Sequence, residues 1–429
     1  MHGRPVLLVW QGVLEDNLAS VELSVQLAAV TAIPAFLDQY WVEDGVLDTE
    51  RRDKLVTSFI GRLGEGEMVR RGFSSALGVL PGSILRGNEE VVIHALIKCS
   101  KITEGTEKWA ETRRDAVKAL GCVVCTALPW LNQELVPHVF DCFMIALEDY
   151  TVDRRGDTGA WVREAAMSGI ECLCLASIMS QVMPCLAQQA TEKIARTKGH
   201  AGKAFSSLLW ATSCTGQDMP GVARVQEVRA IFPKKPDINW TVESETLPRF
   251  VQLLHLPEYK ERIILGLIVS IGGLTERLVK NSSESMFAEL SRMNKAQLET
   301  FTTSLLAVFR RHQKVDRVTI PLFKFLDQLL TSSSLEPLLE EKSSQFSFQL
   351  FSLCKSEITK SGDPNKIMTS GDVFCQLLQV ADTNTVKKCL VQLSIFLCHK
   401  FPRVRKSTAE KMYEALLTFS ENEIISGEL

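Results

Sequence analysis

The chain has 429 residues, of which 45% are hydrophobic and 23% are charged, a composition typical of a folded protein rather than a disordered one. Its 48 basic and 51 acidic side chains give a formal charge of −3. Proteins that bind nucleic acid or an acidic membrane surface mainly through charge carry a clear basic excess, so neither partner is expected. The most apolar stretch, Ile263 to Leu274, is well short of the ~20 residues that cross a bilayer. We expect it to be a buried helix and expect no membrane insertion.

Apolar residues recur at helical spacing along the whole chain, and alternation with period two is scarce. One predicted stripe, near the N-terminus, comprises Leu18, Val21, Val25, Ala28 and Ala32. Another comprises Trp161, Val162, Ala165, Ala166, Ile170 and Leu173. Helix starts are predicted at Asp16-Asn17, Asp157-Thr158 and Asp363-Pro364, and helix ends at Pro34, Pro81-Gly82 and Gly272-Gly273.

A motif recurs inside successive helices: Val followed by Arg or Lys, with a small residue within five positions. Val69-Arg70 precedes Gly72, Val117-Lys118 precedes Gly121, and Val162-Arg163 precedes Ala166, while Val25 stands in the same relation to Ala28-Ala29. The valines are 44, 48 and 45 residues apart, close to the ~40–47-residue period of HEAT and armadillo arrays. The expected fold is therefore all-α, a HEAT- or armadillo-like α-solenoid of stacked helical hairpins.

In such an array Val packs into the layer below, and the small residue lets the paired helix approach. We expect the basic residue to pair with an acidic group of a neighbouring turn, for which Asp115 and Asp157 are the candidates.

Prolines interrupt the helical periodicity between Ala211 and Arg249. We therefore expect three segments: HEAT-like helical repeats over 1–211, an irregular proline-rich connection over 212–248, and a second helical-repeat segment over 249–429. Two further stretches, Thr331–Gln345 and Thr359–Asp372, are rich in Ser, Gly, Lys and Asp and are expected to be mobile loops.

Motifs of catalysis and metal binding are missing from the sequence. It has no phosphate-binding Gly-x-x-x-x-Gly-Lys-(Ser/Thr), no nucleophile elbow and no His-Glu-x-x-His, and its seven histidines are scattered singly. Cys122 and Cys125 have the spacing of a metal or redox pair, but no second pair lies near them and no strand precedes them, so two packed thiols are expected. Twelve cysteines in all fit reduced, buried thiols in a cytosolic protein. We expect no enzyme activity, no catalytic residue, no cofactor and no metal.

Two charged turns are more informative. Glu111-Thr-Arg113-Arg114-Asp115 opens one repeat helix, and Asp153-Arg154-Arg155-Gly156-Asp157 precedes another. Two interpretations remain open: a solvated ladder between repeats, or a line of bidentate donors that binds an acidic protein surface. Trp161 is a candidate either for an anchor at that face or for core filling. The candidate partner-binding residues are Arg113, Arg114, Asp115, Asp153, Arg154, Arg155, Asp157, Trp161 and Arg163.

Six segments of the chain resemble the C-terminal region of the tubulin-folding cofactor D family. They are Ala110–Ala119, Tyr150–Ala166, Gln188–Ile194, Ile238–Trp240, Leu265–Glu276 and Leu397–Lys406. The similarity follows the family's order along nearly the whole chain. Its most specific block is Arg-Gly-Asp-x-Gly-x-Trp-Val-Arg, which runs from Arg155 to Arg163.

The resemblance implies a cytosolic, cytoskeleton-associated tubulin chaperone, with the centrosome as a further location. Members of the family resemble large α-solenoids that capture β-tubulin and join cofactor E, which carries α-tubulin. With cofactor C and a small Arf-like GTPase they form the assembly in which tubulin heterodimers are built or dismantled. The resemblance also implies that this assembly stimulates GTP hydrolysis by tubulin, with the arginine finger attributed to cofactor C.

Two other classes of function remain as alternatives. One is a general HEAT-repeat adaptor for another protein complex, such as a transport or phosphatase scaffold. The other is a hydrolase with an unrecognised site. A tubulin scaffold co-purifies with tubulin or its cofactors, an adaptor with other proteins, and a hydrolase turns over substrate without any partner.

Overall fold

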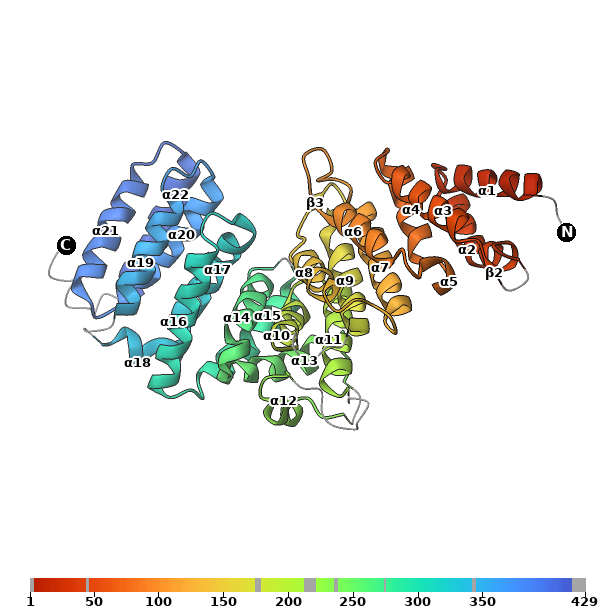
Figure 1. The fold of residues 1–429 in the computed structure, drawn as a ribbon. Coiled ribbons are helices and arrows are strands. Elements are labelled where there is room, and N and C mark those ends of the chain that lie inside the picture. Colours follow the sequence, from red (N-terminus) through yellow and green to blue (C-terminus); the bar gives the residue numbers. More distant parts are fainter. Residues whose placement is uncertain are drawn as a thin grey trace. The chain divides into compact units, whose positions relative to one another are not determined.

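The computed structural model describes residues 4–43, 46–173, 179–211, 221–234, 238–273, 275–341 and 345–418. Within these ranges the regular structure is helical apart from two hairpins of two-residue strands. The predicted all-α fold of stacked helical hairpins is confirmed (Figure 1). In this described part, no helix combines the length and the apolarity that crossing a membrane requires. The chain divides into two compact units, Met1–Val182 with Ala204–Val222 and Met183–Lys203 with Ala223–Leu429.

The first unit is built from four helical hairpins in two layers. One layer comprises α2 (Leu23–Tyr40), α4 (Glu67–Gly78), α7 (Ala110–Ala127) and α9 (Gly159–Leu173), each packed on the next. Their partners are α1 (Arg4–Leu18), α3 (Thr49–Arg62), α6 (Glu89–Ser100) and α8 (Leu135–Ala146). The unit also contains the short helix α5 (Gly82–Leu85) and the strands β1 (Val42–Glu43), β2 (Val46–Leu47), β3 (Val152–Asp153) and β4 (Gly156–Asp157). The four valines of the sequence motif all lie in the first layer, one in each helix.

Small residues set the distance between neighbouring helices of that layer. A Cβ built on Gly121 of α7 would lie 3.1 Å from the Cα of Gly169 in α9. A Cβ built on Gly78 of α4 would lie 2.7 Å from the Cα of Ala119 in α7. A larger side chain at either place would force the backbones apart. Gly121 does allow a close approach, but to α9 of the next repeat and not, as the sequence pattern predicts, to the paired helix of its own hairpin.

The second unit repeats the two-layer arrangement. Its first layer comprises α14 (Pro257–Ile271), α17 (Asp316–Thr331), α20 (Pro364–Gln376) and α22 (Pro402–Thr418). The second comprises α16 (Lys295–Arg311), α19 (Gln345–Ile358) and α21 (Thr383–Leu397). The other helices that the structure describes are α10 (Met179–Thr191), α11 (Ala195–Leu209), α12 (Val225–Ile231), α13 (Glu243–Phe250), α15 (Glu276–Leu290) and α18 (Glu336–Leu339), with 3-10 turns at Val251–His255, Ser333–Leu335 and Leu377–Gln379.

The most apolar stretch of the sequence is a buried helix, as predicted. All residues from Ile263 to Ile271 of α14 are buried. The helix ends at Ile271, where Gly272 serves as the C-cap, so the predicted end at Gly272-Gly273 is confirmed. Leu274, the last residue of the predicted stretch, lies outside the described residues.

Several expectations for the N-terminal hairpin are wrong. The stripe from Leu18 to Ala32 crosses the turn between α1 and α2, and Val21 in that turn is 80% exposed. Gln26 is buried beside this turn, where its Nε2 lies within hydrogen-bond distance of the carbonyls of Leu18 (3.0 Å), Ser20 (2.8 Å) and Met68 (2.8 Å), which share its two N–H groups. Gln26, and not Val25 as the predicted stripe requires, therefore takes the buried position in the first turn of α2. Asp16-Asn17 ends α1 instead of starting a helix, and Pro34 lies inside α2.

The second predicted loop is mostly helix. Asp363 caps α20 by accepting a hydrogen bond from the backbone N of Asn365 at 2.9 Å, so the chain is helical from Pro364 onward. This confirms the helix start at Asp363-Pro364 and corrects the loop expected over Thr359–Asp372. The loop expected over Thr331–Gln345 contains α18, and its residues 342–344 lie outside the described part. The predicted connection over 212–248 contains α12 and most of α13, and the three-segment division stays a prediction.

A pair of glycine variants tests the close packing in the first unit. A Cβ on Gly72 of α4 would overlap the carbonyl oxygen of Leu18, whereas a Cβ on Gly61 in α3 would meet nothing within 4 Å. We expect Gly72→Ala to lower the free energy of unfolding by about 1–3 kcal/mol. Gly61→Ala should raise it by about 0.4–1 kcal/mol, because alanine restricts the unfolded chain. Urea unfolding followed by circular dichroism measures both, and equal effects would contradict the packing.

Asp372 of α20 gives the second unit a pH dependence. Burial, and then the nearby carboxylate of Asp327 in α17, raise the pKa of Asp372 to about 6, against the opposing charge of Lys411 in α22. A carboxyl whose pKa is higher in the folded state destabilises the fold as pH rises from about 4 to about 6.

We therefore expect Asp372→Asn to raise the free energy of unfolding at about pH 7.5 by up to roughly 3 kcal/mol, because asparagine stays neutral. At about pH 4.5, where the folded carboxyl is protonated, the gain should be much smaller. Urea unfolding of both proteins at the two pH values measures the difference. A gain independent of pH would contradict the assignment.

Candidate partner-binding surface

The charged turn before α9 folds as a small β-hairpin. Val152 pairs with Asp157 and Asp153 with Gly156, which leaves Arg154 and Arg155 at the turn. Gly156 has φ of +104°, in the left-handed region that favours glycine. Asp157 then caps α9, since its Oδ1 accepts a hydrogen bond from the backbone N of Ala160 at 3.1 Å. The predicted helix start at Asp157-Thr158 is confirmed, while the hairpin itself was not predicted.

Arg155 joins the hairpin to the preceding repeat through ion pairs. Its guanidinium pairs with Asp153 inside the hairpin at 2.6 Å and with Glu111 at the start of α7. It also lies 5.0 Å from the ring centroid of Trp161, which is half-buried at the start of α9. The hydrogen bond from Arg155 lowers the pKa of Asp153. Burial raises the pKa of Glu111, but the hydrogen bond and charge of Arg155, together with a backbone hydrogen bond and the charge of Arg71, outweigh burial, and this pKa is lowered.

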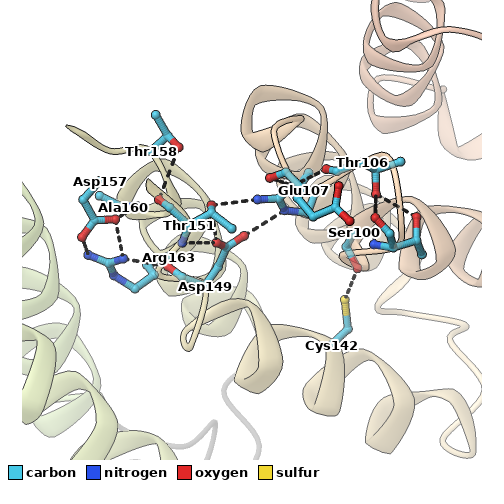
Figure 2. Close-up of polar contacts among 12 residues, drawn as sticks. Ser100, Thr106, Glu107, Cys142, Asp149, Thr151, Asp157, Thr158, Ala160 and Arg163 are labelled. Atoms are coloured by element: carbon cyan, nitrogen blue, oxygen red, sulfur yellow. Dashed lines mark hydrogen bonds and ion pairs between the residues drawn. The ribbon is translucent and has the colours of Figure 1, made fainter. Parts of the chain in front are cut away.

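Arg113 and Arg163 stabilise the region around the β3–β4 hairpin through buried contacts, and each is only 1% exposed. Arg113 donates from Nε to the Asp149 carboxylate at 2.9 Å and from Nη1 to the carbonyl of Thr106 at 2.9 Å. Arg163 donates to the backbone carbonyl of Asp149 at 2.7 Å and pairs with Asp157 at 3.1 Å. Figure 2 shows Arg163 with its partners Asp149 and Asp157. We therefore assign both arginines to the fold and not to a surface that a partner touches.

Asp115 joins two repeats. Arg71 of α4 pairs with its carboxylate at 2.7 Å, and Arg114 of α7 at 2.6 Å. The pairing expected of the basic residue in the Val-(Arg/Lys) motif is confirmed for Arg163, which pairs with Asp157. It is wrong for Arg70, whose Nε donates to the carbonyl of Leu63 at 2.8 Å, so that the neighbouring Arg71 reaches Asp115 instead.

The nine sequence-predicted site residues thus separate by exposure. Arg154 is exposed at the hairpin turn, and the Arg155 side chain is 43% exposed beside it. Arg114, Asp115, Asp153, Asp157 and Trp161 are half-buried, and Arg113 and Arg163 are buried. The surface available to a partner is the hairpin turn, residues 153–156, together with Arg114. That these residues bind a partner stays a prediction.

The structure corrects the account of the cysteine pair. Cys122 and Cys125 are both exposed on α7 instead of packed, and Cys125 takes part in a disulfide bond. The helix turns these two positions away from the buried face of α7, on which Val123, Val124 and Ala127 lie. Within the described ranges, no group of three His, Cys, Asp or Glu side chains is placed to hold a metal ion.

Comparisons with known proteins show which proteins the chain resembles. Residues 180–366 match the family model described as "Tubulin folding cofactor D C terminal". This part of the chain resembles the C-terminal region of tubulin folding cofactor D. It is 23% identical over 337 residues to the tubulin-specific chaperone D of Dictyostelium discoideum, a match that covers 68% of this chain and 22% of that relative. The chain thus spans about a fifth of that curated relative. The resemblance predicted from the sequence motifs is confirmed.

A solved structure of an engineered protein also matches, with 10% identity and a TM-score of 0.31, over 94% of this chain and 98% of that protein. A likeness at this TM-score carries no argument about fold or function. The match to the cofactor D family model begins at residue 180, after the β3–β4 hairpin.

A stability measurement separates the buried arginine from its exposed neighbour. We expect Arg113→Met to lower the free energy of unfolding by about 3–5 kcal/mol, because the carboxylate of Asp149 stays buried without its charged partner. Arg114→Met removes a half-exposed pair and should cost less than about 1 kcal/mol. Adding Asp149→Asn to Arg113→Met should recover part of the loss. Equal losses for the two single variants, measured by urea unfolding, would contradict the assignment of Arg113 to the fold.

Proposed function

We propose that this chain is part of a tubulin-folding chaperone, a scaffold that binds β-tubulin and other tubulin cofactors while the αβ-tubulin heterodimer is assembled or taken apart. The observation that carries the proposal is the match of residues 180–366 to the cofactor D C-terminal family model. A relative named as a tubulin-specific chaperone supports it. Because the match covers only 22% of that relative, the activity of a whole chaperone is not assigned to this chain alone.

The proposed partners are β-tubulin, the tubulin-folding cofactors E and C, and a small Arf-like GTPase. In this proposal the chain contributes to stimulating GTP hydrolysis by tubulin as a binding surface within the complex, without a catalytic residue of its own. The corresponding location is the cytoplasm and the cytoskeleton, including the centrosome. The general HEAT-repeat adaptor remains the alternative, and it predicts capture of proteins other than tubulin and its cofactors.

Binding by a helical stack depends on area and on charge. Each repeat adds a helical hairpin to the stack, so a partner can contact side chains from several repeats at once. Tubulin surfaces are acidic, and Arg154 is an exposed cation at the turn of the β3–β4 hairpin. Its neighbour Arg155 already pairs with Asp153 and Glu111. Arg154 is therefore the cation of this turn that a partner's carboxylate can engage without breaking an internal pair.

The charge of Arg154 tests the proposal. We expect purified αβ-tubulin or β-tubulin to bind the chain, and Arg154→Glu to weaken that binding about 3–10-fold, or roughly 0.7–1.4 kcal/mol. The weakening should shrink in high salt, because the charge lies at the surface. Fluorescence anisotropy with labelled tubulin measures both effects. Arg155→Glu is unsuitable, since the new carboxylate would face Asp153 and Glu111 and release the hairpin.

Lys324→Glu provides the matched control, because Lys324 is an exposed cation of α17 and its reversal changes the net charge equally. Far-UV circular dichroism and thermal unfolding should be unchanged for both variants. Absence of tubulin binding by the unmodified chain would contradict the proposed function. Equal losses for Arg154→Glu and Lys324→Glu would contradict the role of the hairpin turn.

A further inference from the structure

A groove lies within the first unit between three helices of one layer. It has a volume of about 500 Å³ and is lined by α2, α4 and α7. We call it the α2–α4–α7 groove. It lies apart from the residues 153–156 of the β3–β4 hairpin, since none of them lines it.

One wall of the groove is apolar. Leu23, Leu27 and Val30 of α2 line it, and the two leucines are 42% and 56% exposed. These positions have the i, i+4, i+7 spacing of a single helix face. Single exposed leucines are common on protein surfaces, but a stripe beside a hollow is typical of a site that another apolar surface covers.

The opposite wall is basic. Arg71 of α4 and Arg114 and Lys118 of α7 line it, with Asp115 as the accompanying carboxylate. Asp115 pairs with both arginines, at 2.7 and 2.6 Å. One carboxylate thus serves two guanidinium groups, and Lys118 is exposed beside them. Three cations against one anion leave an excess of two positive charges along this wall.

The floor of the groove consists of small residues. Gly72, Ser75 and Gly78 of α4 and Ala119 of α7 line it. Gly72 and Ala119 are buried, and Ser75 and Gly78 are half-buried. None of the four has a side chain larger than that of serine, so no long side chain of the floor occupies the hollow.

The two walls define the chemistry of the occupant. An apolar stripe across from a basic stripe complements a helix with apolar residues on one side and carboxylates on the other. From Leu23 to Val30, α2 rises about 10 Å, which corresponds to two turns of a docked helix. We propose that the α2–α4–α7 groove binds an acidic amphipathic helix of a protein partner. This proposal depends on the geometry of the groove and not on tubulin as the partner.

Designed peptides test the groove directly. The probe is a fluorescein-labelled amphipathic peptide of about 20 residues, long enough to be partly helical alone, with leucines on one face and glutamates on the other. Two matched peptides serve as controls: one carries lysine in place of glutamate, and one has the acidic composition scrambled so that no apolar face forms. Fluorescence anisotropy with the full chain measures binding. We expect the acidic amphipathic peptide to bind at least about tenfold more tightly than either control.

Variants of the chain locate the binding site. Lys118→Glu should weaken binding of the acidic peptide at least about fivefold by reversing a charge of the basic wall. Leu27→Ser should weaken it about 3–10-fold by removing an apolar contact. The matched controls lie outside the groove: Lys98→Glu on α6 and Ile145→Ser on α8, both at exposed positions. They should leave binding unchanged.

Three outcomes would overturn the proposal. The first is equal affinity for the acidic and the control peptides. The second is no binding of the acidic peptide up to about 1 mM, which corresponds to a binding free energy of roughly −4 kcal/mol. The third is an equal effect of the groove variants and their controls. Because the assay contains no tubulin, its failure leaves the tubulin experiment with Arg154→Glu unaffected. Conversely, a chain that fails to bind tubulin can still bind the acidic peptide through the groove.

Discussion

Gly121 of α7 lies against Gly169 of α9, and Gly78 of α4 lies against Ala119 of α7, so three consecutive helices of the first layer meet at backbone distance. That separation determines which side chains reach from one repeat to the next. At this spacing Arg71 of one repeat contacts Asp115 of the following one. Close helices and ion pairs between repeats are therefore parts of one arrangement, and Gly78 and Ala119 also line the groove between α2, α4 and α7.

The charged residues of the first unit divide into two groups with different consequences. Arg113 and Arg163 are buried, and their cost of desolvation is offset by the carboxylate and the carbonyl of Asp149 and by Asp157. They position the β3–β4 hairpin and the start of α9. Arg154 and Lys118 are exposed, and they are the cations from which we argue binding. The block from Arg155 to Arg163 thus stabilises the β3–β4 hairpin and the start of α9. Arg154, the residue just before the block, makes the proposed contact with tubulin.

The repeat could be predicted from the sequence because each unit must place a valine and a small residue in the same layer. Caps such as Asp157 and Asp363 were also predictable, since their bonds are local. The burial of Arg113 was not, because its partner Asp149 lies 36 residues away and belongs to no motif. The hairpin was missed because two-residue strands leave no alternation to detect. The stripe from Leu18 to Ala32 failed because Gln26, a polar residue, takes the buried position in the first turn of α2.

Hydrogen exchange of the chain with and without excess purified αβ-tubulin tests most directly whether the helical stack is a binding surface for tubulin. The account predicts slower exchange in the backbone amides of residues 153–156 and in the first turn of α7, where Glu111 holds the hairpin. Exchange in the buried helix α14 should be unchanged. Exchange that is unaffected along the whole chain, or slowed only in segments away from the hairpin turn, would contradict the account.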